Sequence, residues 1–231
     1  MVDFTGGTWR SLIDGSEVSA IPDTVKYQLN ALDLTGFADG DTVSQWQETI
    51  TETDVAGGGS YQESSINGNA AVRIESNDEA YENQDLEDIT TPLTAFAVVD
   101  NYTYTGDRNY ITGDAFGGLG LEDSGVDKGF RVFGDETNHD IANTDGAKIF
   151  AVRYEADGGD IVVRVDGDET VFSGAGEDNN IPSLLLGLGV NSDEHLNGDA
   201  GILELHDVGL SDNDLVEREN DIADMFDIDL S

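Results

Sequence analysis

The chain has 231 residues, of which 38% are hydrophobic, and it carries 49 aspartates and glutamates against 10 lysines and arginines, a formal net charge of -39. This charge excludes nucleic acid as a partner, because phosphate binding needs clustered lysine and arginine, and it disfavours anionic membrane surfaces. Cysteine is absent, which excludes disulfides, zinc–thiolate centres and cysteine nucleophiles.

The charge also indicates the medium in which the protein folds. Repulsion between so many carboxylates destabilises a compact domain in dilute buffer. At molar salt the screening length falls to about 3 Å, and this repulsion is largely removed. High charge is also typical of disordered chains, but the alternating apolar segments favour a folded domain. We therefore expect a protein of a salt-loving organism, or of a virus that infects one, in a high-salt environment.

The sequence shows no signal for export or membrane insertion. The opening residues, MVDFTGGTWR, lack a basic region followed by an apolar one. No apolar stretch approaches the roughly 20 residues that span a bilayer. We therefore expect a protein made in the cytoplasm, with no signal peptide and no membrane insertion.

Residues 1–33 form a distinct opening segment with no sustained helical period. This segment could be a docked arm or a first strand, and we predict an N-terminal arm that anchors or oligomerises the protein. From residue 34 onward, turn residues separate short apolar runs, a pattern typical of strands. The stretch 50–65 is polar and contains Gly57, Gly58 and Gly59, which is typical of a loop.

The following segments predict further strands. A strand is expected at 70–74, and the continuous apolar run at 91–100 is typical of a buried strand. At 148–154 alternate residues fall on opposite faces. The sequence Ala-Asp-Gly-Gly at 156–159 then predicts a hairpin turn, because glycine readily adopts positive φ.

The end of the chain changes period. Ser211 followed by Asp214 three residues later resembles a capping box at the start of a helix. Leu215, Ile222 and Phe226 then fall on one helical face. The sequence therefore predicts about a dozen short strands and one C-terminal helix, and a strand spacing of roughly 8–12 residues is typical of a β-sandwich.

Several segments resemble one family in their order and spacing. The segment 148–168, KIFAVRYEADGGDIVVRVDGD, resembles a hairpin of laminin-G-like, concanavalin A-like domains, in which a strand ending in tyrosine leads through a glycine turn to a strand ending in Val-Asp-Gly. The segment 196–228 resembles the family's ending, with an Asn-Gly turn, a strand, a Leu-Ser-Asp cap and a short helix. Upstream, 38–47, 67–76 and 91–100 follow the same order.

The resemblance covers residues 34–230 and implies an all-β fold, a concanavalin A-like jelly-roll sandwich of two antiparallel sheets with a short C-terminal helix. We accordingly predict a laminin-G-like domain at 34–231, of the type found in virion surface proteins. Domains of this family commonly bind glycans or proteins, and the fold alone does not decide between them.

Some relatives of this fold are glycosidases, which need two carboxylates about 5 Å apart on a strand motif of the form Glu-x-Asp-x-x-Glu. The nearest matches here, at 155–160 and 219–224, fall on a predicted turn and a predicted helix. His139, His195 and His206 are scattered, and no Gly-x-Ser-x-Gly, His-Glu-x-x-His or P-loop pattern occurs. The sequence therefore predicts that the chain is not an enzyme and has no catalytic residues.

The resemblance also implies calcium binding at a sheet edge through hard oxygen ligands. The alternative is a solvated acidic surface adapted to salt, which the overall excess of acids favours. We expect no required cofactor, with calcium or another cation as the candidate ligand. The candidate metal ligands, all in predicted turns, are Asp39, Asp41, Asp107 and Asp114.

A glycan site calls for exposed aromatic side chains beside amides and carboxylates, and the stretch 101–110 combines these types. The alternative is that its tyrosines are ordinary half-buried strand residues, which are enriched in strands. Trp9 and Trp46 are expected to be packing residues. The candidate glycan-binding residues are Tyr102, Tyr104, Asp107, Asn109 and Tyr110.

These expectations lead to one leading hypothesis and one alternative. The leading hypothesis is a structural protein on the virion surface of a virus of halophilic archaea, as a capsid turret or decoration or as a tail-fibre component. It would be a homo-oligomer that contacts other capsid or tail proteins and binds glycans of the host cell surface. The alternative is a cellular glycan-binding module of a halophilic archaeon.

Overall fold

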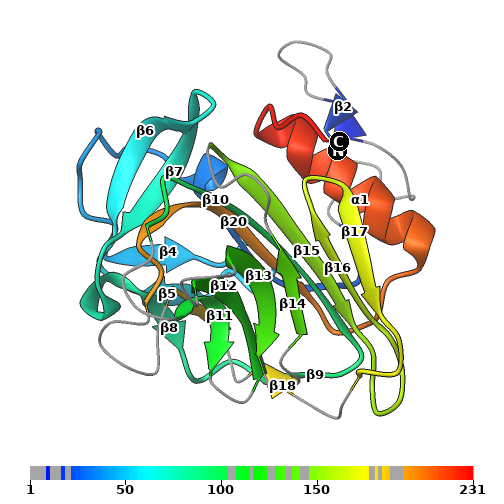
Figure 1. The fold of residues 1–231 in the computed structure, drawn as a ribbon. Helices are drawn as coiled ribbons and strands as arrows, with labels where there is room; N and C mark the ends of the chain where they lie inside the picture. The colour runs from blue at the N-terminus through cyan, green and yellow to red at the C-terminus, as the bar shows by residue number, and fades with distance from the viewer. Residues whose placement is uncertain are drawn as a thin grey trace.

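Two layers of antiparallel strands face one another, and a C-terminal helix covers the outer surface of the larger layer (Figure 1). The computed structural model describes residues 22–103, 111–112, 146–176, 181, 184–187 and 195–230 in full, and for strands outside these ranges it describes the course of the backbone. This architecture confirms the predicted all-β sandwich of two antiparallel sheets with a short C-terminal helix.

The larger layer is an eight-stranded sheet in which strands from both ends of the chain meet. The strand β3 (Val25–Asn30) and the strand β7 (Asn69–Ile74) each pair with a different half of β20 (Gly198–His206). In order across the sheet, the remaining strands are β17 (Asp168–Phe172), β16 (Ile161–Val165), β15 (Lys148–Tyr154), β10 (Leu93–Asp100), β20 (Gly198–His206), β7 (Asn69–Ile74) and β6 (Ser60–Ile66).

The facing layer consists of two four-stranded sheets that meet at β11 (Arg108–Asp114) and β19 (Leu184–Leu186). There the backbone N–H of Gly187 donates to the carbonyl oxygen of Ile111 at 2.8 Å. One sheet contains β11 (Arg108–Asp114), β12 (Gly117–Asp123), β13 (Lys128–Phe133) and β14 (Thr137–Asp140). The other contains β19 (Leu184–Leu186), β8 (Tyr81–Asn83), β5 (Asp54–Ala56) and β4 (Gln45–Gln47). The shorter pairs are β1 (Trp9–Arg10) with β2 (Glu17–Val18), and β9 (Ile89–Thr90) with β18 (Asn180–Ile181).

The strand β10 is buried along its whole length because both of its faces are covered. Ala95 and Ala97 belong to the core between the two layers, here called the interlayer core. Phe96 and Val98 belong to a second core between the sheet and the helix, here called the helix core. A strand covered on both faces has no solvent-facing positions, which explains the continuous apolar run.

The residues of β15 alternate between these two cores, as predicted. Ile149 and Ala151 lie in the helix core, whereas Phe150 and Val152 lie in the interlayer core. The predicted hairpin turn follows, and Gly158 adopts a φ of +76° there. Trp46, a predicted packing residue, is 1% exposed in the interlayer core; the side chain of Trp9 lies outside the described residues.

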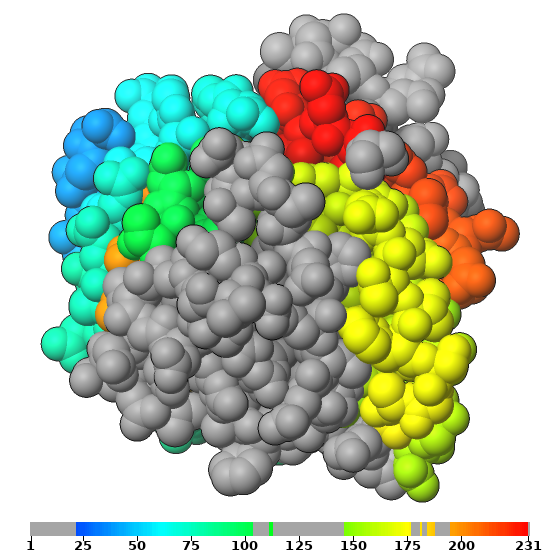
Figure 2. All heavy atoms as spheres, in the orientation of Figure 1, coloured from blue at the N-terminus to red at the C-terminus, as the bar shows by residue number. Residues whose placement is uncertain are grey.

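The helix α1 (Asp212–Met225) begins at the predicted cap, where the Ser211 hydroxyl accepts a hydrogen bond from the backbone N–H of Asp214 at 3.2 Å. Its apolar face, which includes the buried Leu215, completes the helix core. At its other end, Asn67 Nδ2 donates to the carbonyl oxygen of Phe226 at 3.1 Å. Figure 2 shows the red C-terminal residues against the cyan β6–β7 hairpin. Within the described part of the chain, no helix is long and apolar enough to cross a membrane.

The predicted loop at 50–65 is wrong, because this stretch contains β5 and most of β6. Its side chains are polar because these strands expose one face to solvent. A Cβ atom at Gly57 would lie 2.4 Å from the ring of Tyr81, and one at Gly59 would lie 2.6 Å from Val72. These glycines therefore allow close packing rather than forming a loose turn.

The opening segment 1–33 contributes a strand to the sandwich. Residues Val25–Asn30 form β3, which pairs with Ile202–His206 of β20. Residues 25–30 therefore belong to the sheet, although they precede the predicted domain start at residue 34. The alternative of a first strand holds for this part of the segment, and an anchoring or oligomerising role of the segment stays a prediction.

Candidate functional site

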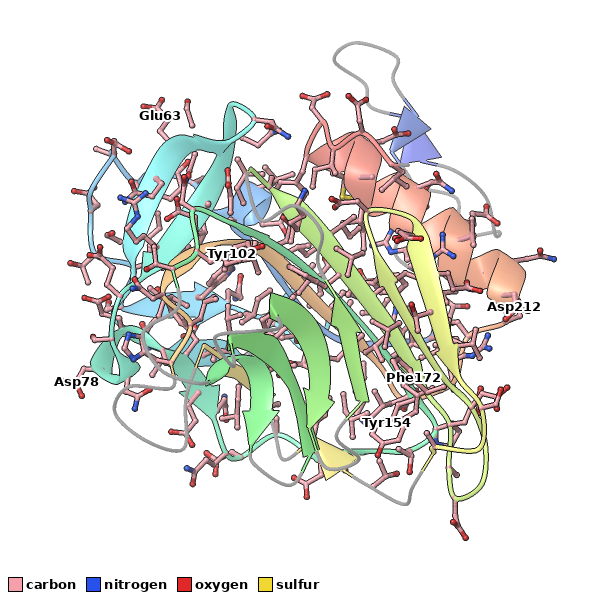
Figure 3. All side chains as sticks on the ribbon, in the orientation of Figure 1. Glu63, Asp78, Tyr102, Tyr154, Phe172 and Asp212 are labelled. Carbon is pink, nitrogen blue, oxygen red and sulfur yellow. The ribbon has the colours of Figure 1, made fainter. Side chains whose placement is uncertain are left out.

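The structure describes the predicted glycan-binding residues only in part. Tyr102 is half-buried just after β10, where its ring packs against the interlayer core, with its centroid 6.5 Å from that of Phe150 (Figure 3). Asn109 and Tyr110 lie in β11, of which the backbone is described. Tyr104 and Asp107 lie outside the described residues. The predicted glycan patch therefore stays a prediction.

Of the predicted metal ligands, Asp39 and Asp41 are described, and both are exposed. The Asp41 carboxylate accepts from the backbone N–H of Ala38 at 2.8 Å, and that of Asp39 accepts from the backbone N–H of Glu63 at 3.1 Å. The side chains of Asp107 and Asp114 lie outside the described residues. Among the described residues, no group of three or more acidic or histidine side chains is placed to hold a metal ion.

Every lysine and arginine whose side chain the structure describes is engaged in an ion pair. Several of the partners are fully buried carboxylates, whereas unpaired acids such as Glu63 and Asp78 lie at the outer rim (Figure 3). This arrangement leaves a surface dominated by carboxylates. The shortest ion-pair distances are Lys26–Glu87 at 2.9 Å, Arg73–Asp199 at 2.7 Å, Lys148–Asp166 at 2.8 Å, Arg153–Asp212 at 2.5 Å, Arg164–Glu219 at 2.6 Å and Arg218–Glu204 at 2.5 Å.

The most deeply buried of these pairs lies between β20 and α1, next to β3. Glu204 Oε1 accepts from Arg218 Nε at 2.7 Å and contacts His206 Nε2 at 2.9 Å. Its Oε2 accepts from Arg218 Nη2 and from Gln28 Nε2, each at 2.5 Å. Burial alone would raise the pKa of Glu204, but hydrogen bonds and charge from Arg218 and His206 lower this pKa to about 2.

This network anchors the start of β3. His206 Nδ1 lies 2.9 Å from the hydroxyl of Thr24, in the turn that precedes β3. The other edge of β3 is held by Glu48, a fully buried carboxylate that accepts from the backbone N–H of Gln28 at 2.7 Å and from that of Ile50 at 2.8 Å. The two buried acids therefore fix β3 and the loop around residue 50 next to each other.

A pocket of about 450 Å³, here called the edge pocket, lies between β3 and this loop. Its apolar side chains include Tyr27 and Ile50, the latter 39% exposed. Lys26 donates to Glu87 at 2.9 Å, and this hydrogen bond raises the pKa of Lys26. The lining residues are Asp23, Val25, Lys26, Tyr27, Ile50, Thr51, Asp85, Leu86, Glu87 and Asp207.

A second pocket of about 380 Å³, here called the helix pocket, lies between the turn at 22–24 and α1. Asp23 lines both pockets, so the two adjoin. Arg218 lines the helix pocket although only 2% of the residue is exposed. The lining residues are Pro22, Asp23, Thr24, Leu210, Asp214, Glu217, Arg218 and Asp221.

Sequence reasoning missed both pockets. Their residues come from segments that are far apart in the chain, and no local motif joins them. Lys26 is the single signal that could have drawn notice, because lysine is rare in so acidic a chain.

No protein-family model and no curated protein matches this chain. Among solved structures, it is similar to Trypanosoma rangeli sialidase in complex with sialic acid (TM-score 0.53, 13% identity, 91% of this chain and 34% of that chain). It is also similar to the binding domain of botulinum neurotoxin DC in complex with rat synaptotagmin II (TM-score 0.52, 11% identity, 86% of this chain and 51% of that chain). A third similar structure is domain 4 of AbnA, a GH43 extracellular arabinanase from Geobacillus stearothermophilus, in complex with arabinotriose. Its TM-score is 0.47 and its identity 13%, over 87% of each chain.

The two-layer architecture and the two likenesses with TM-scores above 0.5 define the class as a β-sandwich fold. The chain spans about a third of the sialidase chain and half of the toxin domain. At these identities the likeness shows the fold alone, and the family resemblance of the sequence stays a resemblance.

One prediction from the sequence has to be corrected. The chain was expected not to be an enzyme because it lacks a paired-acid strand motif, but chains that share its fold include sialidases. The lack of that motif therefore does not separate this chain from enzymes, and the negative conclusion does not stand. The fold likeness assigns no activity in its place.

Proposed function

We propose that this chain is a glycan-binding β-sandwich that works in concentrated salt, and that the edge pocket is its binding site. The observation that carries the proposal is the pocket's composition: apolar walls from Tyr27, Ile50 and Leu86 beside an ammonium and several carboxylates. Ligand sites for small molecules are typically pockets of about 300–1,000 Å³ with apolar walls and a few convergent polar groups. Sugar rings present both apolar C–H faces and hydroxyls, which match such walls.

The setting that we propose is the surface of a virion of a virus of halophilic archaea, as a capsid turret or decoration or a tail-fibre component. The acidic surface supports the high-salt part of this proposal, because screening relieves carboxylate repulsion there. The sandwich fold supports a role in recognition. Host surface glycans and neighbouring capsid or tail proteins are the partners that follow, with a homo-oligomer as the assembled form.

A matched pair of variants tests the glycan site. Ile50 and Val171 are both exposed apolar residues, at 39% and 46%, but Val171 lies on β17 and does not line the edge pocket. Ile50→Ser is expected to weaken binding on a glycan array in molar salt, whereas Val171→Ser is expected to leave it unchanged. Equal effects of the two variants, or no glycan binding by the unaltered chain, would overturn the proposal.

The virion setting needs a separate experiment. Mass spectrometry of density-banded particles from a culture that makes the protein gives its copy number relative to the major capsid protein. A fixed copy number supports a virion component and separates a many-copy head protein from a few-copy fibre. Absence from particles, with the protein found in cells or medium, contradicts the virion and leaves the cellular glycan-binding module.

A further inference from the structure

The helix pocket contains a buried hydrogen-bond donor for which the described residues supply no acceptor. Arg218 Nη1 is buried and has no hydrogen-bond partner among the described residues. Asp221 Oδ2 lies 3.7 Å from Nη1, within ion-pair distance but beyond hydrogen-bond distance. Leaving a buried donor without a hydrogen-bond acceptor is costly, and such groups in folded proteins call for an explanation.

The rest of the guanidinium is held firmly. Nε and Nη2 of Arg218 both bind Glu204. Glu204 is in turn held by Gln28 and His206. The Arg218 side chain therefore cannot turn to satisfy Nη1 without breaking a buried ion pair. A donor fixed in this way is pre-organised for a ligand that supplies an acceptor.

The charges around the pocket limit what that ligand can be. The carboxylates of Asp23, Asp214, Glu217 and Asp221 line the pocket together with Arg218. An anionic ligand, such as a sialic acid or a uronic acid, would meet four carboxylates against one guanidinium that Glu204 already neutralises. A hydroxyl group can accept from Nη1 and donate its own proton to a carboxylate. A neutral, hydroxyl-rich ligand therefore fits this pocket.

We propose that the helix pocket is a second sugar subsite, so that the two adjoining pockets bind a neutral oligosaccharide of more than one unit. This inference rests on the proposed glycan-binding function. Asp23 lines both pockets and is the point at which a bound chain passes from one to the other. Arg218 Nη1 is the donor that fixes the sugar in the helix pocket, which is also lined by Thr24, whose hydroxyl lies 2.9 Å from His206 Nδ1.

The test compares ligand length and ligand charge in molar salt. The probes are neutral gluco- and mannooligosaccharides from mono- to hexasaccharide, and oligogalacturonates of the same lengths, with affinity measured by titration calorimetry. A hydrogen bond to a charged donor adds about tenfold in affinity, so the neutral oligomers are expected to bind at least that much more tightly than the monosaccharide. The oligogalacturonates are expected to show no such gain.

Two variants on exposed positions of α1 localise the effect without touching the buried ion pair. Glu217→Trp places a bulky ring at the helix pocket and is expected to abolish the gain with length while leaving monosaccharide binding at the edge pocket unchanged. Asn220→Trp, an exposed residue that does not line the pocket, is the control and is expected to retain the gain.

The outcomes separate the two proposals. Monosaccharide binding without any gain for longer neutral oligomers, an equal gain for the galacturonates, or a gain that survives Glu217→Trp overturns the second subsite alone. A crystal structure with bound oligosaccharide that shows only a water molecule at Arg218 Nη1 also overturns the second subsite. No binding of any oligomer overturns the glycan-binding function itself.

Discussion

Arg218 and Glu204 meet through two hydrogen bonds, Nε to Oε1 at 2.7 Å and Nη2 to Oε2 at 2.5 Å, with both residues almost completely buried. The pair joins α1 to β20, and through Gln28 it also reaches β3. Three elements from the two ends of the chain therefore depend on one ion pair.

Breaking this pair from one side is expected to be strongly destabilising. Glu204→Gln leaves the Arg218 charge buried without a counter-charge, a change that costs about 3–5 kcal/mol of unfolding free energy. The double variant Glu204→Gln with Arg218→Met removes both charges and is expected to be the more stable of the two. Denaturant unfolding in molar salt measures the unfolding free energies of the two variants. Equal stabilities of the single and double variants would contradict the expected coupling.

Acid is expected to weaken the fold through the same carboxylate. The pKa of Glu204 is about 2 in the folded protein, against an ordinary value of 4.5. A lowered folded-state pKa means that the stabilisation is present above pH 4.5 and is lost as the pH falls toward 2. The shift corresponds to about 3 kcal/mol. Burial would raise the pKa of Asp199, but hydrogen bonds from Arg73, Ser65 and Asn101 lower it overall. Protonation of Asp199 in acid is therefore also expected to destabilise the fold.

Unfolding free energies measured at several pH values between neutral and strongly acid check this expectation. The Glu204→Gln variant is expected to show a shallower decline, because it lacks the titrating group. Burial raises the pKa of Asp100, so Asp100→Asn serves as a control that should not remove the acid sensitivity. An unchanged decline in Glu204→Gln would show that other carboxylates carry the effect.

Removal of salt is expected to loosen the molecule. The described basic side chains are already paired, so added cations are the means of screening the remaining surface carboxylates. Dialysis below about 0.5 M salt lengthens the screening distance and restores the repulsion. Circular dichroism and small-angle scattering across a salt series report the loss of structure and the increase in size. Constant spectra and a constant radius would refute the expected dependence on salt.

A glycine in β20 is expected to tolerate no side chain. A Cβ atom at Gly201 would lie 2.7 Å from the Phe226 ring and 2.9 Å from Ile66. Gly201→Ala should therefore lower stability by about 1–3 kcal/mol, as overpacked cores do. Gly174→Ala is the comparison, because nothing lies within 4 Å of the added atom and its positive φ alone is the source of strain. Thermal unfolding of both variants in molar salt shows whether the buried site costs more.

The sequence was informative where local pattern and burial agree. The alternation at 148–154 and the cap at Ser211 depend on neighbouring residues, and both appear in the structure as predicted. The stretch 50–65 was misread because its glycines, typical of turns in isolation, serve the packing of Tyr81 and Val72. That requirement arises from residues outside the stretch, so no local pattern reveals it.

The candidate site was less predictable than the fold for a related reason. The edge pocket depends on Lys26, Ile50 and Glu87, which are far apart in the sequence; Glu48 holds the backbone at Ile50 next to β3, and Lys26 contacts Glu87 directly. The excess of acids also masked the buried carboxylates, because Glu48 and Glu204 look in the sequence like any of the solvated ones. What sets these two apart is the set of hydrogen bonds that surrounds them in the fold.

The pairing of β3 with β20 also sets the order in which the molecule can be completed during synthesis. Residues 25–30 leave the ribosome long before their partner strand at 202–206 and the helix at 212–225 that covers it. The central strand β10 likewise has no partner on one of its edges before β20 has been made. Contacts between such distant segments form slowly, and strand edges remain unpaired until they have formed. One side of β10 and one side of β3 therefore stay unpaired until residues 198–206 of β20 have been made.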